Sequence, residues 1–207
     1  MNLTWGKVDN LDWNLDSDWE VEIKVELEIT KSQNIDLLSE RNNMITSSDD
    51  AASVEVEGEE LWLSKRFLSV HSPFFSTFFN GDLKDEATGS SAFKELKLEE
   101  FLHFLALIYN IDVPVDERSV SYLLSLGDRY QCDSIVRQCH VFLKSADSAS
   151  MAVEEKIRLA DRYGFLFLMK TSIQKMSMDK LKQIMRSGDH NKLSKFAQNL
   201  LFERFVF

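Results

Sequence analysis

A proline that precedes a phenylalanine-rich stretch sets the strongest constraint on how this chain can fold. Residues 64–81 read SKRFLSVHSPFFSTFFNG. Pro73 cannot continue a helix that begins before it, but its fixed φ suits the first turn of a new one. Gly81 is suited to ending that second helix. The sequence therefore predicts two short helices in tandem, broken at Ser72, whose hydroxyl is a candidate helix cap.

Four phenylalanines crowd the second of these helices, at positions 74, 75, 78 and 79. Successive residues of an α-helix are rotated by about 100°, so the four rings cannot all face one core. An exposed phenylalanine forgoes about 2 kcal/mol of burial, and such side chains are typical of interaction surfaces. We expect two or three of them to pack in the core and at least one to be exposed or buried against a partner.

The flanking segments predict a hairpin before these helices and a strand and longer helix after them. Around Gly58, apolar and polar residues alternate over residues 53–63, as in a β-hairpin. Residues 93–98 are predicted as a strand, and it leads into a helix over residues 99–109. One face of that helix is apolar. The face comprises Phe101, Phe104, Leu105 and Ile108.

In this order and spacing, the elements resemble a BTB/POZ domain. The matching positions are Lys65, Leu68, Ser72, Pro73, Phe75, Phe79, Gly81, Asp82, Phe101, Ile108, Tyr109, Leu123, Leu124, Asp128 and Tyr130. The resemblance implies an α+β fold over residues 49–145, with a short three- to five-stranded sheet flanked by a cluster of helices. The sequence departs from the family where its first strand usually opens with Asp, because Ala51 stands there beside Asp49 and Asp50.

The segment before this domain alternates apolar and acidic residues over residues 19–29, as a strand with one solvated face does. Together with its Trp-led start, it is similar to the closing strands of a MATH domain. Residues 1–31 are therefore predicted to be a remnant of such a domain. Residues 32–48 are polar and are predicted to be a linker with at most one helical turn.

An internal repeat follows, in which LGDRYQCDSIVRQCHVFL (residues 126–143) matches LADRYGFLFLMKTSIQKM (residues 159–176) at an offset of 33 residues. A repeat of this length predicts stacked helical hairpins. Residues 146–207 are accordingly predicted to form a small helical extension. It is similar to the extension found after BTB domains in cullin adaptors.

The family resemblance implies two interaction surfaces. Its dimers use the first helix and an N-terminal strand, so the expected dimer residues here are Val54, Leu61, Leu63, Phe67 and Leu68. Members that bind cullin-3 carry a hydrophobic-x-Glu motif after the second helix; here Leu83-Lys84-Asp85 stands there, with an acid one methylene shorter. The expected cullin-facing residues are Phe78, Phe79, Leu83, Asp85, Glu86 and Tyr109.

Charge and composition argue against several other classes of protein. The net charge is −10, and residues 1–60 hold 16 acidic against 4 basic side chains, which disfavours direct nucleic-acid binding. No apolar run approaches the roughly 18 residues of a membrane span, and the start lacks a signal-peptide pattern. Cys132 and Cys139 have no metal-ligand spacing. We therefore expect an intracellular protein, cytoplasmic or nuclear, that does not bind membranes.

No motif indicates an enzyme, a cofactor, a metal or a small-molecule substrate, since the four histidines lie far apart and Ser72 lacks the glycines of a nucleophile elbow. The sequence thus predicts a homodimeric or heterodimeric BTB protein that serves as a substrate adaptor of cullin-3 ubiquitin ligases. One alternative is an oligomerisation module without cullin binding. Another is a degenerate family member that captures intact relatives.

Overall fold

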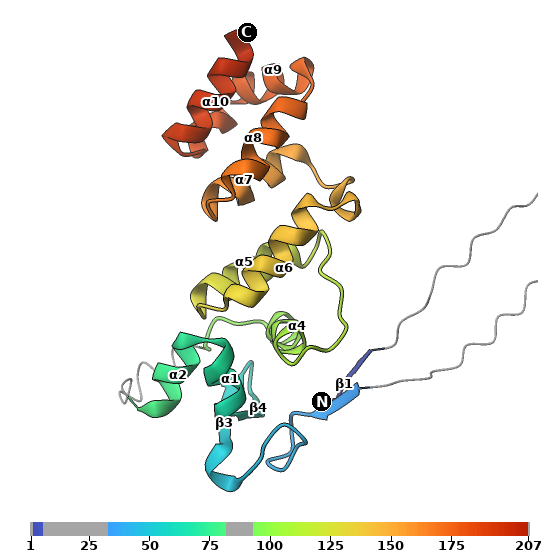
Figure 1. Ribbon diagram of the computed structural model, residues 1–207, viewed down its shortest axis with the longest axis vertical. Helices are drawn as coiled ribbons and strands as arrows, with labels where there is room; N and C mark the ends of the chain where they lie inside the picture. The colour runs from blue at the N-terminus through green and yellow to red at the C-terminus, as the bar shows by residue number, and fades with distance from the viewer. Residues whose placement is uncertain (1, 6–32, 82–92, 207) are drawn as a thin grey trace, which may run out of the picture. The chain divides into compact units, whose positions relative to one another are not determined.

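The computed structural model describes residues 2–5, 33–81 and 93–206 (Figure 1). The chain divides into two compact units, Met1–Pro114 and Val115–Phe207. The first unit combines short strands with helices and the second is helical, so the fold is the predicted α+β type with a helical extension. The strands of the described residues form two separate two-stranded sheets.

The predicted hairpin is present as β3 (Ala51–Val56) and β4 (Glu59–Ser64), which pair antiparallel with Val54 opposite Leu61. Glu57 and Gly58 form its turn with φ of 48° and 83°. Two successive positive φ values define the tight turn that matches the strand twist, and glycine adopts one of them without strain. The apolar side chains of one face are buried.

The predicted break at Ser72 separates α1 (Lys65–His71) from α2 (Pro73–Asn80). Each helix starts with a serine cap: Ser64 Oγ accepts a hydrogen bond from the Phe67 amide, and Ser72 Oγ accepts one from the Phe75 amide, both at 3.1 Å. Pro73 occupies the first turn of α2, and Gly81 ends it with a φ of 85°. The prediction of two short tandem helices broken at Ser72 is therefore confirmed.

Helix α4 (Leu98–Ile108) is also present as predicted, with both sides of its C-terminal half buried. The strand predicted over residues 93–98 is wrong, because residues 93–95 form turns and α4 starts at Leu98. Phe93 and Leu96 are both buried, but they are three residues apart, which is a turn spacing rather than the two-residue period of a strand. The Glu57 carboxylate accepts a hydrogen bond of 2.7 Å from the Leu98 amide and so caps α4.

The segment expected as a linker packs against the hairpin. Strand β2 (Gln33–Asp36) pairs antiparallel with β1 (Asn2–Trp5), and both Ile35 and Leu37 are buried. The Leu37 carbonyl accepts a 2.7 Å hydrogen bond from the Trp62 amide on β4. The 3-10 turn η1 (Ser48–Asp50) then leads into β3. The alternating strand expected over residues 19–29 lies outside the described residues.

The second unit contains the repeat that the sequence predicts. The first hairpin is α5 (Val120–Arg129) with α6 (Asp133–Lys144), and the second is α7 (Val153–Arg162) with α8 (Leu166–Lys175), so corresponding helices start 33 residues apart. The turns match as well. Gln131 and Gly164 hold the same place in the two turns, with φ of 51° and 70°.

A third pair of helices completes this unit. The short turn η2 (Ala146–Ser148) joins the first two hairpins, and α9 (Met178–Ser187) and η3 (Asp189–Lys192) lead to α10 (Lys195–Val206). Figure 1 shows α7 to α10 stacked as neighbours. The Asp161 carboxylate fixes the start of α10, since it accepts a 2.7 Å hydrogen bond from the Ser194 amide.

Candidate functional site

A buried aspartate holds together the elements that present α1. Asp50 is 1% exposed, and its carboxylate accepts hydrogen bonds from Ser64 Oγ at 2.9 Å, the Arg66 amide at 2.8 Å and the Thr46 amide at 3.0 Å. These donors belong to the end of β4, the first turn of α1 and the loop before η1. Asp50 therefore supplies the buried acid at the start of the first hairpin strand, one residue before Ala51.

The ionised form of Asp50 is favoured by this geometry. Burial acts to raise its pKa, but the hydrogen bonds from Thr46, Arg66 and Ser64 outweigh burial and lower the pKa below its ordinary value. Tyr109 lies near this network. Burial raises the pKa of its phenol, and the negative charge of Asp50 acts in the same direction, so the phenol stays neutral.

The residues expected at a dimer interface divide into a buried group and one partly exposed ring. Four of them, Val54, Leu61, Leu63 and Leu68, are at most 6% exposed within a single chain. They form the core beneath α1 rather than its surface. The Phe67 ring is half-buried, 4.7 Å from the His71 ring and 5.1 Å from the Tyr109 ring.

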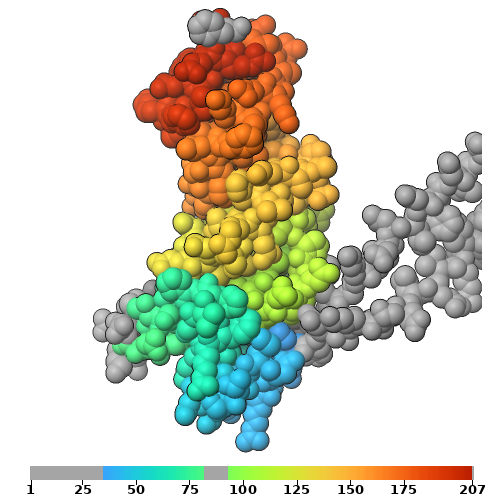
Figure 2. All heavy atoms as spheres, viewed as in Figure 1, coloured from blue at the N-terminus to red at the C-terminus, as the bar shows by residue number. Residues whose placement is uncertain are grey.

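The outer surface of α1 carries a residue that the sequence reasoning missed. Val70 is 83% exposed, more than any other large apolar side chain in the described residues. Its position two residues after Leu68 gave the signal, because a rotation of about 200° places Val70 on the side of α1 opposite the buried Leu68. In the space-filling view, α1 and α2, coloured teal to green, lie on the near face of the first unit (Figure 2).

The phenylalanines of α2 behave as the helical period requires. Phe75 is fully buried, whereas the rings at positions 74, 78 and 79 are half-buried. Phe78 contacts Phe93 edge-on with 5.5 Å between ring centroids, and Phe93 in turn contacts Phe101 of α4 at 5.7 Å. This row of rings joins α2 to α4, and the three half-buried α2 rings keep part of their area at the surface.

A groove of about 660 Å³ lies beside these rings. Its lining includes Phe78 and Phe93 together with the hairpin glutamates Glu55 and Glu60. A lining that combines aromatic rings with charged side chains can bind apolar and polar groups of a partner together. Among the other residues expected to face cullin, Phe79 is half-buried and Tyr109 is 7% exposed. Leu83, Asp85 and Glu86 lie outside the described residues.

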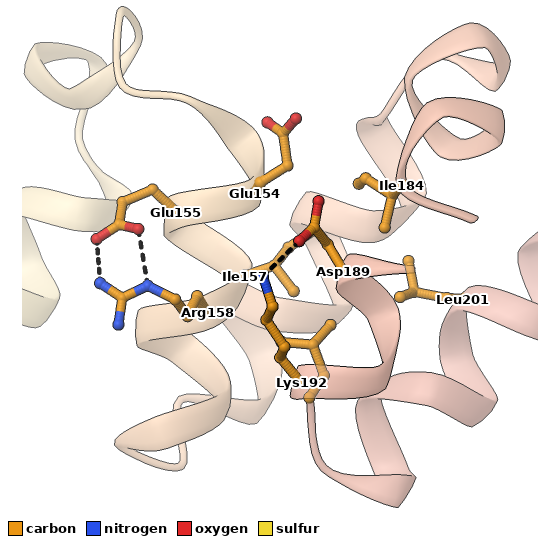
Figure 3. Close-up of a pocket in the computed structure, with 9 residues that line it drawn as sticks. Glu154, Glu155, Ile157, Arg158, Ile184, Asp189, Lys192 and Leu201 are labelled. Carbon is orange, nitrogen blue, oxygen red and sulfur yellow. Dashed lines mark hydrogen bonds and ion pairs between the residues drawn. The ribbon is translucent and has the colours of Figure 1, made fainter. Parts of the chain in front are cut away.

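The second unit contains a small cavity of about 170 Å³ between α7, α9, η3 and α10. Figure 3 shows Ile157, Ile184 and Leu201 around it. The charged side chains at its edge neutralise one another. These pairs are Glu155 with Arg158, Asp189 with Lys192 at 2.8 Å, and Glu154 with Lys180. The inside of the cavity is therefore apolar, and the ion pairs of its lining residues carry no net charge.

Burial suppresses the reactivity of the two cysteine thiols. Cys132 and Cys139 are buried free thiols, and burial raises their pKa values to about 11 and about 12, so both stay protonated near neutral pH. The described part of the chain contains no cluster of three or more side chains that could hold a metal ion. Over the same residues, no helix is both long and apolar enough to cross a membrane.

Comparison with known proteins matches residues 47–147 to the BTB/POZ domain. Over 152 residues, the chain is 25% identical to the BTB and MATH domain-containing protein 38 of Caenorhabditis elegans, covering 73% of this chain and 39% of that protein. It is also 25% identical over 111 residues to the human Kelch repeat and BTB domain-containing protein 4, covering 54% of this chain and 21% of the relative. The chain therefore spans less than half the length of either relative.

The hairpin, the paired helices α1 and α2 and the family match together define the class of residues 47–147: this part of the chain is a BTB/POZ domain, which is a protein-interaction module. The chain is also similar to the BTB and MATH domain-containing protein 45 of Caenorhabditis elegans, with 24% identity over 123 residues that cover 59% of this chain and 26% of that protein. Most of the predicted MATH remnant, residues 1–31, lies outside the described residues.

Proposed function

We propose that this protein is a dimeric adaptor, or adaptor-like subunit, of cullin-3 ubiquitin ligases, and that it acts by binding proteins rather than by catalysis. The observation that carries the proposal is the match of residues 47–147 to the BTB/POZ domain, together with the half-buried phenylalanine rings on α2. The same proposal keeps the domain limits predicted above, with the interaction module over residues 49–145.

The dimer surface in this proposal is the outer face of α1. A valine that is 83% exposed forgoes about 1.5 kcal/mol of burial, which a second copy or another BTB protein can recover. In this proposal Val70, rather than the four buried residues, is the main dimer contact. Phe67 lies at the edge of the dimer surface. The buried group supports the surface from below.

The cullin surface in this proposal runs from α2 to residue 86. Phe78 and Phe79 are half-buried, and Phe78 borders the groove beside the hairpin, so an apolar side chain from a partner can pack there. Leu83 follows this surface in sequence and occupies the hydrophobic position of the family motif. Asp85 retains the charge of the motif with a shorter side chain.

Substitution of Leu83 by glutamate is expected to reduce the recovery of cullin-3 in a pull-down by at least tenfold, because a charge replaces an apolar contact at an interface. The matched control is Leu38→Glu, since Leu38 is a 48% exposed leucine of the same unit outside the proposed surface. Both variants should remain dimeric in light scattering. Undiminished recovery of cullin-3 by the Leu83 variant would exclude this surface.

The second candidate function is oligomerisation without cullin binding. The observation that favours it is the acid at the motif position, which is Asp85 rather than glutamate and shortens the side chain by one methylene. The two functions differ in a single experiment on the wild-type protein. A stable dimer that fails to bind purified cullin-3 supports oligomerisation alone, whereas a dimer that binds cullin-3 supports the adaptor.

A further inference from the structure

Three large apolar side chains are exposed where α6 and α8 meet. Val141 on α6 is 68% exposed, and Leu166 and Phe167 at the start of α8 are 58% and 69% exposed. Neighbouring positions on both helices, such as Leu143 and Leu168, are buried and supply the core contacts. The exposed side chains are therefore not required for packing within the unit.

Direct contacts show that these exposed positions are close in space. Lys144 of α6 lies over the Phe167 ring of α8, with Nζ 5.9 Å from the ring centroid. One turn earlier on α6, the His140 ring stacks on the Phe165 ring at 4.3 Å. We call the exposed surface formed by Arg137, Val141, Lys144, Phe167 and Lys170 the α6–α8 patch.

The charge of the patch is opposite to that of the whole chain. Residues 134–146 and 164–178 contain no aspartate or glutamate, although the chain carries a net charge of −10. Within the described residues, none of the cations Arg137, Lys144 and Lys170 has an ion pair. Elsewhere in the same unit, basic side chains pair with acids, as Lys180 does with Glu154. The patch thus combines unpaired positive charge with exposed apolar surface.

We propose that the α6–α8 patch is a docking surface for an acidic segment of a partner protein that carries a large apolar side chain between its acids. The apolar side chain would pack on Phe167 and Val141, and flanking carboxylates would pair with Lys144, Lys170 and Arg137. An apolar centre with a charged rim is the usual arrangement of protein interfaces.

A protein segment fits this surface better than a nucleic acid or a lipid membrane does. Binding to a nucleic acid or an anionic membrane sums over many phosphate contacts, whereas this patch has three cations on a chain with a net charge of −10, which disfavours a polyanionic partner. An exposed aromatic ring with Lys144 over it, and with further exposed cations on the same two helices, instead provides an apolar anchor for a partner side chain together with selection for negative charge. The patch lies on the second unit, whereas the proposed cullin surface lies on the first. An experiment can therefore contradict one proposal without contradicting the other.

The test uses the full chain and a fluorescent synthetic peptide in which one tryptophan is flanked by glutamates. Fluorescence anisotropy should report binding that weakens with added salt, because the ion pairs are at the surface. Lys144→Glu and Phe167→Ser should each lower the affinity at least tenfold. The matched controls Lys182→Glu and Phe196→Ser, which change exposed residues on α9 and α10, should bind the peptide as the wild type does.

Three results would overturn the proposal. The first is the absence of peptide binding by the wild type, and the second is equal binding by the patch variants and their controls. The third is retention of affinity when glycine replaces the peptide tryptophan, because charge alone would then explain binding. Single-stranded DNA and vesicles of anionic phospholipid serve as competitors. Stronger binding of either than of the peptide would assign the patch to phosphate recognition and contradict the proposal.

Discussion

Replacement of Asp50 by alanine is expected to lower the free energy of unfolding by about 3 kcal/mol, because it leaves one buried and two part-buried donors without their charged acceptor. The donors are Ser64 Oγ and the amides of Arg66 and Thr46. Urea unfolding at a fixed protein concentration measures the change. Amide hydrogen exchange at Arg66 should accelerate in the variant, since that amide loses its partner.

The control for this substitution is Asp49→Ala. Asp49 precedes Asp50 in the same 3-10 turn, but its side chain is exposed. Its removal should change the unfolding free energy by no more than about 0.5 kcal/mol, as is usual for surface positions. Equal losses for the two variants would show that the carboxylate of Asp50 is not the link between β4 and α1.

The contribution of Asp50 should also depend on pH. Its folded pKa lies below its ordinary value, so the stabilisation is fully present above the unfolded pKa of about 3.9 and is lost as pH falls through the folded pKa. The difference in unfolding free energy between wild type and Asp50→Asn should therefore be constant near neutral pH. It should shrink as the pH is lowered below about 4.

Val70→Asp is expected to convert the proposed dimer to a monomer at micromolar concentration, because a carboxylate would be buried against an apolar partner surface without a counter-charge. The protomer itself should remain folded, since Val70 is 83% exposed and contributes little to the core. Size-exclusion chromatography with light scattering measures the mass, and circular dichroism checks the helical content.

Val141→Asp is the matched control, because it introduces the same change at a valine that is 68% exposed on α6. It should leave the dimer intact. Dissociation of both variants would point to a general effect of added charge. A fully dimeric Val70 variant would instead remove α1 from the proposed interface.

Local sequence patterns predicted the elements of this fold where a backbone rule applies. Pro73 and Gly81 located α2, and the 33-residue repeat located both hairpins of the second unit. The strand predicted over residues 93–98 was wrong, because it rested on the apolar residues Phe93, Leu96 and Leu98, of which Phe93 and Leu96 are buried from a turn. Their spacing of three residues fits a turn that is tied to the hairpin through Glu57, a contact between residues 41 positions apart.

The candidate site was harder to predict because exposure depends on tertiary packing. The alternation along the hairpin places Leu61 and Leu63 on its apolar face. It cannot tell whether that face packs in the core or forms an interface. Asp50 shows the same limit of local reasoning. Its place one residue before Ala51 suggested a departure from the family, yet the geometry of η1 directs its carboxylate to Ser64 and the start of α1.

The central claim is that this protein dimerises through its BTB/POZ domain and binds cullin-3 as a dimer. Light scattering of the wild-type protein, alone and mixed with the purified N-terminal domain of cullin-3, tests it most directly. The account predicts the mass of a dimer for the protein alone and the mass of a dimer with two cullin domains for the mixture. A monomer in the first measurement, or an unchanged mass in the second, would contradict it.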